Sequence, residues 1–560
     1  MTKRWLAIAS AAAIGATWYL LLPASPVALP LTGDTTAPIR GAIHVHTRRS
    51  DGTGTVEDVA AAARRAGLQF VIITDHGDGT RGSDTPVYRS GVLCIDAVEV
   101  STNGGHVVAL GLPQTPFPLG GEVGDVIEDV RRMGGMSIAA HPDSTRAQLG
   151  WADWTAAVDG IEWLNGDSQW RDEDWRSIGH AVLTYPFRRA PTLATLLDRP
   201  DDLMSRWDML LRDRAVVAVA AADAHARIGP GGDPYGRSFT LHLPSYEQVF
   251  RALSISLPEV RLNGNAREDA QTVIDAVRGG HVFSTIDALA SPALLTFVAT
   301  SGSHRAVMGD YLPLDGSVTL RVESNAPPGS NMRLLSDGRT VASGAPPTLS
   351  YEASPEPAVY RVEIDVAGAP GATPVPWVVS NPIYVGPRPV SETTLKPAAV
   401  SETRAVYSDG TAANWRIEKS VRSEGLLSVA PAVDGTQLLL RYGLGGTLSE
   451  GPYVAAVIES GSDLTRFNRL MFTARSMQPM RLTFEVRANS SADRRWGKSV
   501  YLDQTARTVT IAFDEMTPLG TATGRPILED VNDLLFVVDT VHTKQGSSGQ
   551  VWLDDIRYVR

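Results

Sequence analysis

The sequence predicts a multidomain protein in which an α/β domain is followed by two all-β domains, behind an N-terminal membrane helix. Short apolar runs alternate with helix-like stretches from residue 38 to residue 290, which is typical of a parallel βα architecture. From residue 291 onward, apolar and polar residues alternate between Gly- and Pro-containing turns, which indicates antiparallel strands with one buried face. The 560 residues are enough for about three or four domains.

Residues 1–30 predict a signal anchor or transmembrane segment, because a lysine and an arginine precede an uncharged apolar run over residues 5–22. A run of about 18 residues is the lower limit for a spanning helix and is longer than most signal-peptide cores. Pro26 and Leu22 stand at position −3 of the two candidate cleavage sites and disfavour cleavage. We expect a membrane-anchored protein whose bulk is exported, periplasmic or extracellular; the alternative is a cleaved signal and a secreted protein.

The α/β domain is expected over residues 38–290. The segment "TVEDVAAAARRAG" predicts a helix, with Thr55 and Asp58 as a capping box and Gly67 at the end, before the buried strand "LQFVIITDH". Four further strands are predicted in "HVVALGL", "MSIAAHP", "VDGIEWLN" and "AVVAVAAADAH". With "GAIHVH", that makes six strands, and four of them carry a candidate metal ligand at or just past the C-terminal end. The other two carry His106 at the start and Asn165 at the end.

A cluster of potential metal ligands lies within this domain. In "GAIHVHTRRSDG", strand alternation sends His44 and His46 to the same face. Cys94 is the only cysteine, which excludes a thiolate cluster and an intramolecular disulfide. Nitrogen and oxygen ligands suit Zn, Mn or Fe, and two or three ions about 4 Å apart would clamp a phosphoryl group. The candidate ligands are His44, His46, Asp51, His76, Glu99, His106, His141, Asp223 and His225.

The two all-β domains are expected over residues 291–386 and 398–560, joined by a linker over 387–397. In "VTLRVESN", the alternation places Val318, Leu320 and Val322 on one face, as in a small β-sandwich. The linker "GPRPVSETTLKPA" offers no core-facing side. Strands of the last domain are predicted in "YVAAVIES", "RLMFTAR", "RLTFEVRA", "TVTIAF", "LLFVVDT" and "QVWLDDIRYV".

The motifs "HVHTRRSDG", "IITDH", "EVSTNGGHVVALGL", "AAHP", "IEWLN" and "AADAH" resemble, in this order, those of the polymerase-and-histidinol-phosphatase (PHP) domain family. The resemblance covers about 250 residues. It implies a distorted (β/α)7, TIM-like barrel with a trinuclear metal centre that hydrolyses phosphate esters. All nine candidate ligands match positions of the family's metal set, with Glu99 as the bridging glutamate.

The resemblance also suggests catalytic roles. A metal-bound hydroxide would attack phosphorus, and His141 or another site histidine is a candidate to protonate the leaving group. Arg48, Arg49 and Arg227 adjoin ligands and could grip a phosphate; alternatively, they are surface arginines. Asp75 could orient a ligand histidine or cap the following loop. The candidate catalytic residues are His141, Asp223, Arg48 and Arg227.

The β domains carry resemblances of their own. Residues 291–386 resemble the immunoglobulin-like unit that follows some exported PHP domains. Residues 398–560 look like a galactose-binding-type jelly roll, a fold of many carbohydrate-binding modules. Trp415, Tyr453 and Trp496 could stack on sugar rings, or they could belong to the core.

Together these features predict an extracytoplasmic metal-dependent phosphoesterase, either a phosphatase or a phosphodiesterase, with two to three divalent Mn, Fe or Zn ions. The expected partners are a phosphorylated small-molecule or polymer substrate, the membrane and, at the C-terminal domain, a glycan. The net charge of −11 gives no support for a stable nucleic-acid partner. A nuclease or oligonucleotidase with the same centre, and a non-catalytic glycan-binding surface protein, are the alternatives.

Overall fold

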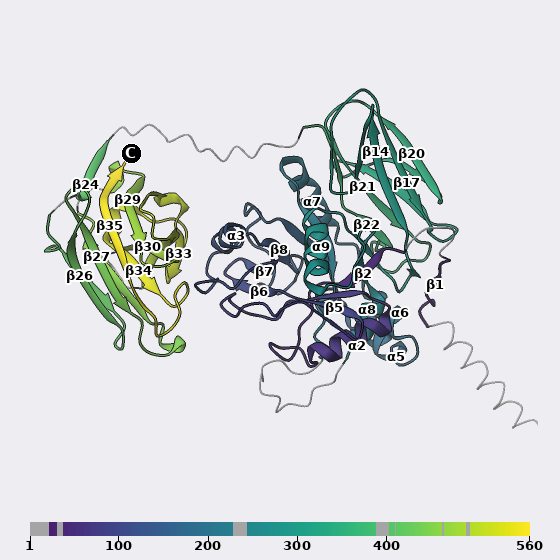
Figure 1. Ribbon diagram of the computed structural model, residues 1–560, viewed down its shortest axis with the longest axis horizontal. Helices are drawn as coiled ribbons and strands as arrows, with labels where there is room; N and C mark the ends of the chain where they lie inside the picture. Colours follow the sequence, from purple (N-terminus) through teal and green to yellow (C-terminus); the bar gives the residue numbers. More distant parts are fainter. Residues whose placement is uncertain are drawn as a thin grey trace, which may run out of the picture. The chain divides into compact units, whose positions relative to one another are not determined.

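The computed structural model describes residues 22–30, 37–227, 243–387, 402–408, 410–461, 464–488 and 493–560 (Figure 1). Residues 1–21 of the predicted anchor and 388–397 of the predicted linker lie outside them. Within the described ranges, no helix combines the length and the apolar composition that crossing a membrane requires. The described residues pack into two compact units: the first takes those within 1–77, 82–113 and 127–391, and the second takes those within 78–81, 114–126 and 392–560.

A ring of hydrogen-bonded strands forms the centre of the first unit. β2 and β3 are parallel, β3 is parallel to β5, and β8, β9 and β10 are parallel to one another. β5 runs on into β6 after Ala97. Isolated bridges join the two sheets on both sides, Val45 with Ala224 and His76 with Glu99. The ring strands are β2 (Ile39–Ala42), β3 (Phe70–Ile73), β5 (Val92–Asp96), β6 (Val98–Thr102), β7 (Gly105–Leu110), β8 (Met136–Ala140), β9 (Gly160–Asn165) and β10 (Val217–Ala221).

Helices follow several of these strands, and apolar side chains from the strands and α9 share one buried core. The predicted capping box is confirmed: Thr55 and Asp58 bond reciprocally at the start of α2, and Gly67 ends that helix with φ 79°. The helices are α2 (Val56–Ala66), α3 (Val123–Arg132), α4 (Gly166–Arg171), α5 (Trp175–Thr184), α6 (Arg189–Ala194), α7 (Asp201–Asp213), α8 (Tyr246–Ala252) and α9 (Ala266–Arg278).

A hairpin interrupts the βα pattern, and there the expectation of parallel strands is wrong. β6 and β7 are antiparallel around Asn103 and Gly104, and β7 is also antiparallel to β8. Gly105 has φ 121°, a backbone conformation that favours glycine. An Asn-Gly pair between apolar runs is a hairpin signal in the sequence. Because β7 runs in the opposite direction, its beginning lies at the edge where the parallel strands end, and this explains why His106 begins a strand.

Strands between residues 295 and 385 form a β-sandwich, as predicted. Its core takes side chains from both sheets, among them Phe297, Leu320 and Ile364. One sheet contains β14 (Leu295–Ser301), β15 (His304–Val307), β17 (Val318–Ser324) and β20 (Thr348–Ala353). The other contains β16 (Tyr311–Leu312), β18 (Asn331–Ser336), β19 (Arg339–Gly344), β21 (Ala358–Asp365), β22 (Val378–Ser380) and β23 (Ile383–Val385).

This sandwich is continuous with the strand ring. β11 (Ser254–Leu257) pairs with β2 and with β12 (Phe283–Thr285), and β12 pairs with β22, so one sheet runs through both. The buried Asn381 accepts from the backbone N–H of Ala218 at 2.8 Å and donates to the carbonyls of Ala218 at 2.9 Å and Val282 at 2.8 Å. The sandwich therefore fixes β10, the strand that leads to Asp223 and His225. Short strands β1 (Val27–Ala28), β4 (Val87–Arg89) and β13 (Ala290–Ser291) complete the first unit.

The second unit contains another β-sandwich, of two six-stranded antiparallel sheets. Trp496 is fully buried in its core and donates to the carbonyl of Gly524, so it is a core residue and no sugar platform. Trp415 and Tyr453 are partly buried against core residues. The first sheet contains β24 (Thr403–Tyr407), β26 (Glu424–Pro431), β27 (Thr436–Gly443), β29 (Arg469–Ser476), β32 (Arg507–Ala512) and β35 (Ser548–Val559). The second contains β25 (Trp415–Lys419), β28 (Tyr453–Glu459), β30 (Met480–Ala488), β31 (Arg494–Leu502), β33 (Thr517–Gly520) and β34 (Val531–Asp539).

Replacing Asn381 by alanine should lower the free energy of unfolding by about 2–5 kcal/mol, because three buried backbone groups lose their partner. Urea unfolding of the full chain measures this change, with the exposed Asn331→Ala as the matched control. An Asn381→Ala protein as stable as the control would show that this side chain does not hold β10 in place.

Candidate metal centre

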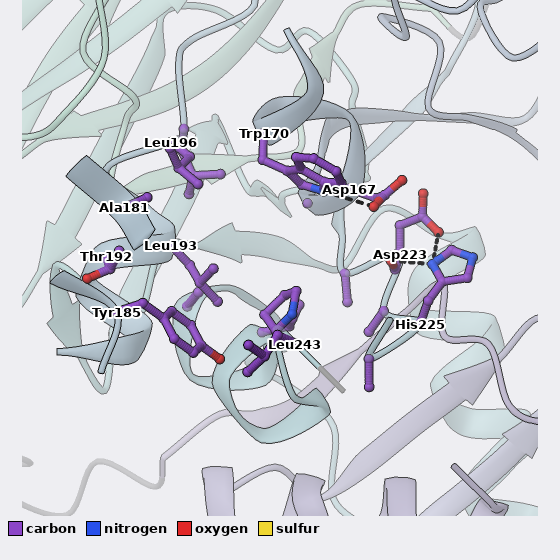
Figure 2. A pocket seen from close by; sticks show the side chains of 18 of the residues that line it. Asp167, Trp170, Ala181, Tyr185, Thr192, Leu193, Leu196, Asp223, His225 and Leu243 are labelled. Carbon is purple, nitrogen blue, oxygen red and sulfur yellow. Dashed lines mark hydrogen bonds and ion pairs between the residues drawn. The ribbon is translucent and has the colours of Figure 1, made fainter. Parts of the chain in front are cut away.

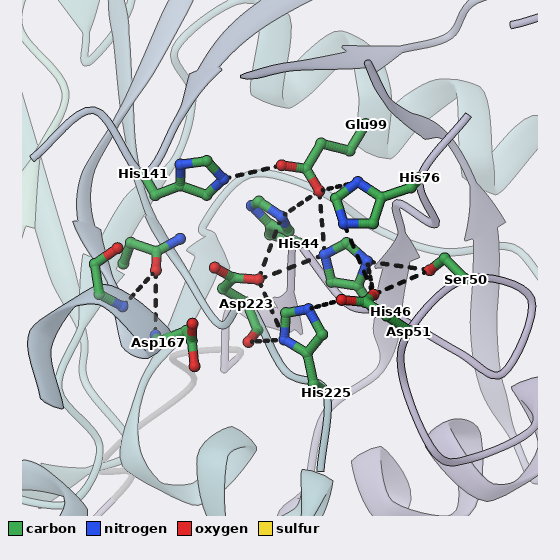
Figure 3. A network of polar contacts seen from close by, with 12 residues as sticks. His44, His46, Ser50, Asp51, His76, Glu99, His141, Asp167, Asp223 and His225 are labelled. Carbon is green, nitrogen blue, oxygen red and sulfur yellow. Dashed lines mark hydrogen bonds and ion pairs between the residues drawn. The ribbon is translucent and has the colours of Figure 1, made fainter. Parts of the chain in front are cut away.

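Nine polar side chains gather at one edge of the strand ring, and Figure 3 labels eight of them. They come from the loop after β2, from β6 and β7, and from the residues directly after β3, β8 and β10. They are the nine candidates of the sequence, and the structure brings all of them together. In each of four overlapping groups, potential ligand atoms lie within 4.8 Å of one another: His46, Asp51, His76 and His225; His44, Glu99 and His141; His44, His46 and Asp223; His76, Glu99 and His106.

Glu99 lies at the centre of this cluster and contacts five histidines. Its Oε1 is 2.8 Å from Nδ1 of His106 and 2.9 Å from Nε2 of His141. Its Oε2 is 3.2–3.3 Å from one nitrogen of each of three further histidines. These nitrogens are Nε2 of His44, Nε2 of His46 and Nδ1 of His76. A carboxylate with both oxygens among imidazoles is placed to bridge two cations.

Asp223 and Asp51 are the other two carboxylates of the nine-residue cluster. Asp223 places Oδ1 3.4 Å from Nε2 of both His44 and His46. Asp51 lies 3.3 Å from Nδ1 of His46 through Oδ1 and 3.2 Å from Nε2 of His225 through Oδ2. The Asp51 side chain is 43% exposed, whereas Glu99 and Asp223 are buried, so Asp51 marks the solvent side.

Among the described residues, three buried atoms at the middle of the cluster lack a hydrogen-bond partner: Nε2 of His44, Nε2 of His46 and Oε2 of Glu99. They lie close to one another, yet their orientation gives no hydrogen bond. Burying unpaired polar atoms is costly, and a divalent cation among them would satisfy all three. Imidazole and carboxylate donors without thiolate suit Zn, Mn or Fe. The residues therefore fit one or more metal ions.

The backbone of three of the nine residues is strained. His44, His141 and Asp223 have φ of 64°, 33° and 43°, a left-handed region that costs non-glycine residues about 1–3 kcal/mol each. β2 has ended at Ala42, so strand alternation does not bring His44 and His46 together, contrary to the sequence argument. Their rings, 5.1 Å apart, converge because the chain turns at His44 and the next residue, Val45, is bridged to Ala224.

Most of the histidines are held through Nδ1, which leaves Nε2 directed into the cluster. Nδ1 of His141 lies 3.2 Å from the carbonyl of Leu149, and Nδ1 of His225 lies 3.0 Å from the carbonyl of Asp223. Nδ1 of His46 lies 3.3 Å from Oγ of Ser50. Such contacts fix the tautomer and the ring orientation of metal-binding histidines.

Glu162 is a site residue that the sequence argument missed. It is fully buried on β9, its Oε1 lies 2.5 Å from Nδ1 of His44, and its Oε2 accepts from the backbone N–H of His141 at 2.7 Å. Nδ2 of Asn165 donates to the same Oε2 at 2.8 Å. Glu162 thus positions two ligands that are 97 residues apart in the chain. A glutamate inside the otherwise apolar run "GIEWLN" is the signal that could have identified it, because a charge on a buried strand needs partners.

Asp75 and Tyr246 hold the loop that carries His46. Asp75 accepts from the backbone and the hydroxyl of Thr47 at 2.7 and 2.6 Å and from Oγ of Ser50 at 2.7 Å, so it orients His46 indirectly, through Ser50. The hydroxyl of Tyr246 donates to the carbonyl of His46 at 2.8 Å. These contacts agree with the orienting role expected of Asp75, exerted through Ser50, and they hold the loop after β2 rather than the loop that follows Asp75.

The electrostatics of the cluster favour bound cations. Burial alone would lower the pKa of His46, but contacts with Asp223 and Glu99 outweigh it and raise that pKa to about 10. Burial would raise the pKa of Glu99, but the surrounding histidines, His44 foremost, hold it well below its usual range. His76 is different, because burial dominates and lowers its pKa. Without metal, protons on the histidines therefore balance the buried carboxylates.

The predicted arginines lie at different distances from the cluster. The Arg48 side chain is 63% exposed, and its Nη2 lies 3.9 Å from Oδ2 of Asp58, as expected for a surface arginine. Arg49 is held by Asp96 at 3.0 Å and Asp84 at 3.2 Å. Arg227 lines a cavity together with Asp223 and His225, whereas Arg49 Nε lies 3.5 Å from Oδ2 of Asp75, beside the loop that carries His46.

No family model matches the chain. A protein of Methanocaldococcus jannaschii, described as uncharacterized protein MJ1587, is 28% identical over 137 residues, which are 22% of this chain and 80% of that protein. Among solved structures, the family 11 carbohydrate-binding module of a Clostridium thermocellum cellulosomal cellulase is 14% identical over 29% of this chain and 96% of the module, with a TM-score of 0.25. A family 30 carbohydrate-binding module from the same organism is 12% identical over 28% of this chain and 97% of the module, with a TM-score of 0.22.

Replacing Glu162 by glutamine should lower metal affinity about 10–100-fold, because an amide offers only one acceptor oxygen for the two ligands that Glu162 positions. Calorimetric titration of the metal-free protein with Mn²⁺ measures the affinity, and circular dichroism checks the fold. The exposed Glu259→Gln is the matched control and should bind as the parent does. Equal affinities in both variants would contradict the positioning role.

Metal binding should release protons, because His46 has a pKa of about 10 in the metal-free protein and is protonated at neutral pH. The apparent Mn²⁺ affinity should therefore rise as the pH increases from 6.5 to 8.5, and it should level off only above about pH 10, where His46 loses its proton without metal. Titration in two buffers of different ionisation enthalpy counts the protons, and we expect at least about one per chain. No proton release and a flat affinity would rule out this competition.

Proposed function

We propose that the chain is a metal-dependent hydrolase of phosphate esters, and that the nine-residue cluster is its active site. One observation carries this proposal: Glu99 contacts five histidines, and its Oε2, with Nε2 of His44 and of His46, is buried without a hydrogen-bond partner. Structural metal sites are usually closed and mononuclear, whereas four overlapping ligand groups with an exposed carboxylate at one side suit an open, multinuclear centre.

The proposal extends to the fold. We propose that the strand ring is a distorted (β/α)7 barrel of the PHP type, with its active site at the edge where parallel strands end. The sandwich of 295–385 is an immunoglobulin-like unit, and the sandwich of the second unit is a galactose-binding-type jelly roll. The N-terminal segment of residues 1–30 anchors the exported chain in the membrane.

The metal ions would be two or three of Mn, Fe or Zn, held by the nine residues. Such ions lower the pKa of bound water and stabilise charge on a phosphoryl group. In the hydrolysis, oxygen from water bonds to phosphorus, the bond from phosphorus to the alcohol oxygen breaks, and the alcohol leaves with a proton. Both ring nitrogens of His141 are engaged, by Glu99 and Leu149, which supports a ligand role over proton donation. Arg227 is the residue best placed to bind a phosphoryl oxygen.

Two alternatives remain open to test. A nuclease or oligonucleotidase would use the same centre on a phosphodiester. A non-catalytic glycan-binding surface protein would bind glycan through the sandwich of the second unit. In that case the cluster would be a metal-stabilised scaffold.

Replacing His44 and His46 together by alanine should abolish turnover and remove about one metal ion or more per chain, because both side chains contribute unpartnered donors to the cluster. Mass spectrometry of bound metals, and product release from nitrophenyl phosphate, a nitrophenyl phosphodiester and a short oligonucleotide, measure the two effects. The exposed His304→Ala is the matched control and should change neither.

The substrate ratios then separate the functions. Chelator-sensitive turnover that favours the monoester or small diester supports the phosphoesterase, and turnover confined to the oligonucleotide identifies a nuclease. Stoichiometric metal without turnover of any ester contradicts the enzyme proposal and favours the glycan-binding scaffold.

A further inference from the structure

A cavity of about 430 Å³ adjoins the metal-ligand cluster in the first unit. Asp223, His225 and Arg227 line one part of it, and α4, α5, α6 and α8 supply half of the remaining lining residues. Figure 2 shows Asp223 and His225 on one side, and the side chains of Tyr185, Leu193 and Leu196 on the other. The volume lies in the range of small-molecule sites, about 300–1000 Å³.

The part of the cavity away from the cluster is apolar. Its lining includes Ile178, Ala181, Leu193, Leu196, Val249 and Leu253. Two of the few polar groups in this wall already have partners: Nε1 of Trp170 donates to Asp167 at 2.9 Å, and the hydroxyls of Thr192 and Thr184 bond at 3.1 Å. The hydroxyl of Tyr185 also lines the cavity and has no hydrogen-bond partner among the described residues. Apart from this one hydroxyl, a polar group of a substrate placed here would give up water without gaining a partner, whereas a methylene group would gain by leaving water.

The cavity also reaches the surface of α5. Val182 belongs to its lining and is 68% exposed. A long apolar group that extends beyond the cavity on this side therefore meets an apolar side chain. The same cavity thus has charged groups at one end and a mainly apolar wall that reaches the protein surface at α5.

We infer that this cavity selects phosphate esters of an apolar alcohol: the phosphoryl group lies at the metal-ligand cluster beside Arg227, and the alkyl or aryl group lies against the apolar wall. The inference rests on the proposed phosphoesterase function and names its substrate class. Sugar phosphates and nucleotides are poor fits, because their leaving groups carry several hydroxyls or other polar groups, whereas this wall offers the single unpartnered hydroxyl of Tyr185 among the described residues. Soluble amphiphiles and membrane lipids share the required chemistry.

The test is a chain-length series of ethyl, butyl and octyl phosphate, used below micelle-forming concentrations with the metal-loaded full chain. Their leaving groups have nearly the same acidity, so differences report binding of the alkyl group. We expect kcat/KM to rise about threefold to fourfold per methylene until the cavity is filled. Values that stay flat or fall from ethyl to octyl phosphate would overturn the inference.

Ala181→Phe places a ring into the cavity, and Leu183→Phe on the same helix is the matched control, since Leu183 is 56% exposed and outside the lining. Ala181→Phe should lower the ratio of kcat/KM for octyl phosphate to kcat/KM for ethyl phosphate to near one. Leu183→Phe should show the same rise of kcat/KM with alkyl chain length as the parent protein. An unchanged series in a folded Ala181→Phe protein would place the alkyl group elsewhere.

Calorimetry separates this inference from the proposed function. If no ester is hydrolysed, the phosphoesterase proposal fails, but binding of octyl phosphate at least about tenfold tighter than ethyl phosphate, lost in Ala181→Phe, still supports the apolar cavity. Equal binding of both esters overturns it. Turnover of hexadecyl phosphate in phosphatidylcholine vesicles that exceeds turnover of monomeric octyl phosphate identifies a membrane source, and the reverse order identifies a soluble amphiphile.

Discussion

The contact of the buried Glu99 carboxylate with five histidines is the interaction on which the candidate centre depends. A charge this deeply buried is tolerated only when it is paired, and here its partners are nitrogens that bind either protons or metal ions. Asp223 imposes the same requirement from the other side of His44 and His46. The buried carboxylates of the cluster therefore require positive charge beside them. A divalent ion supplies two such charges, whereas a proton supplies one.

The closed ring of strands makes the arrangement of the nine side chains possible. His44, His141 and Asp223 have strained backbones, and such conformations persist only when neighbouring contacts fix them. The backbone N–H of Ala224 donates to the carbonyl of His44 at 3.2 Å, and Glu162 accepts from the N–H of His141. Strand pairing on one side and a buried carboxylate on the other therefore hold the ligand-bearing turns. The sandwich of 295–385 contributes through Asn381, which secures β10 before the chain reaches Asp223.

The surroundings of the centre are asymmetric. Asp223, His225 and Arg227 occupy one end of the 430 Å³ cavity, and aliphatic side chains of α5, α6 and α8 form much of the remaining wall. The proposed preference for esters of an apolar alcohol follows from this contrast between a charged end and a mainly apolar wall. The cavity was not anticipated from the sequence, since its lining comes from helices whose apolar residues read as ordinary core positions.

The sequence by itself determined six strands of the first domain, without β5 and β6 of the ring, as well as the capped helix α2, the β-strand character of the later domains and the identity of all nine residues in the cluster. These are local properties: apolar periodicity, capping residues and polar side chains at strand ends. Only the tertiary structure decided how β6 and β7 pair, that the sandwich shares a sheet with the ring, that Glu162 orients His44 and His141, and that Trp496 is a core residue. Each of these depends on contacts between segments distant in the chain or on a local turn geometry that periodicity does not encode.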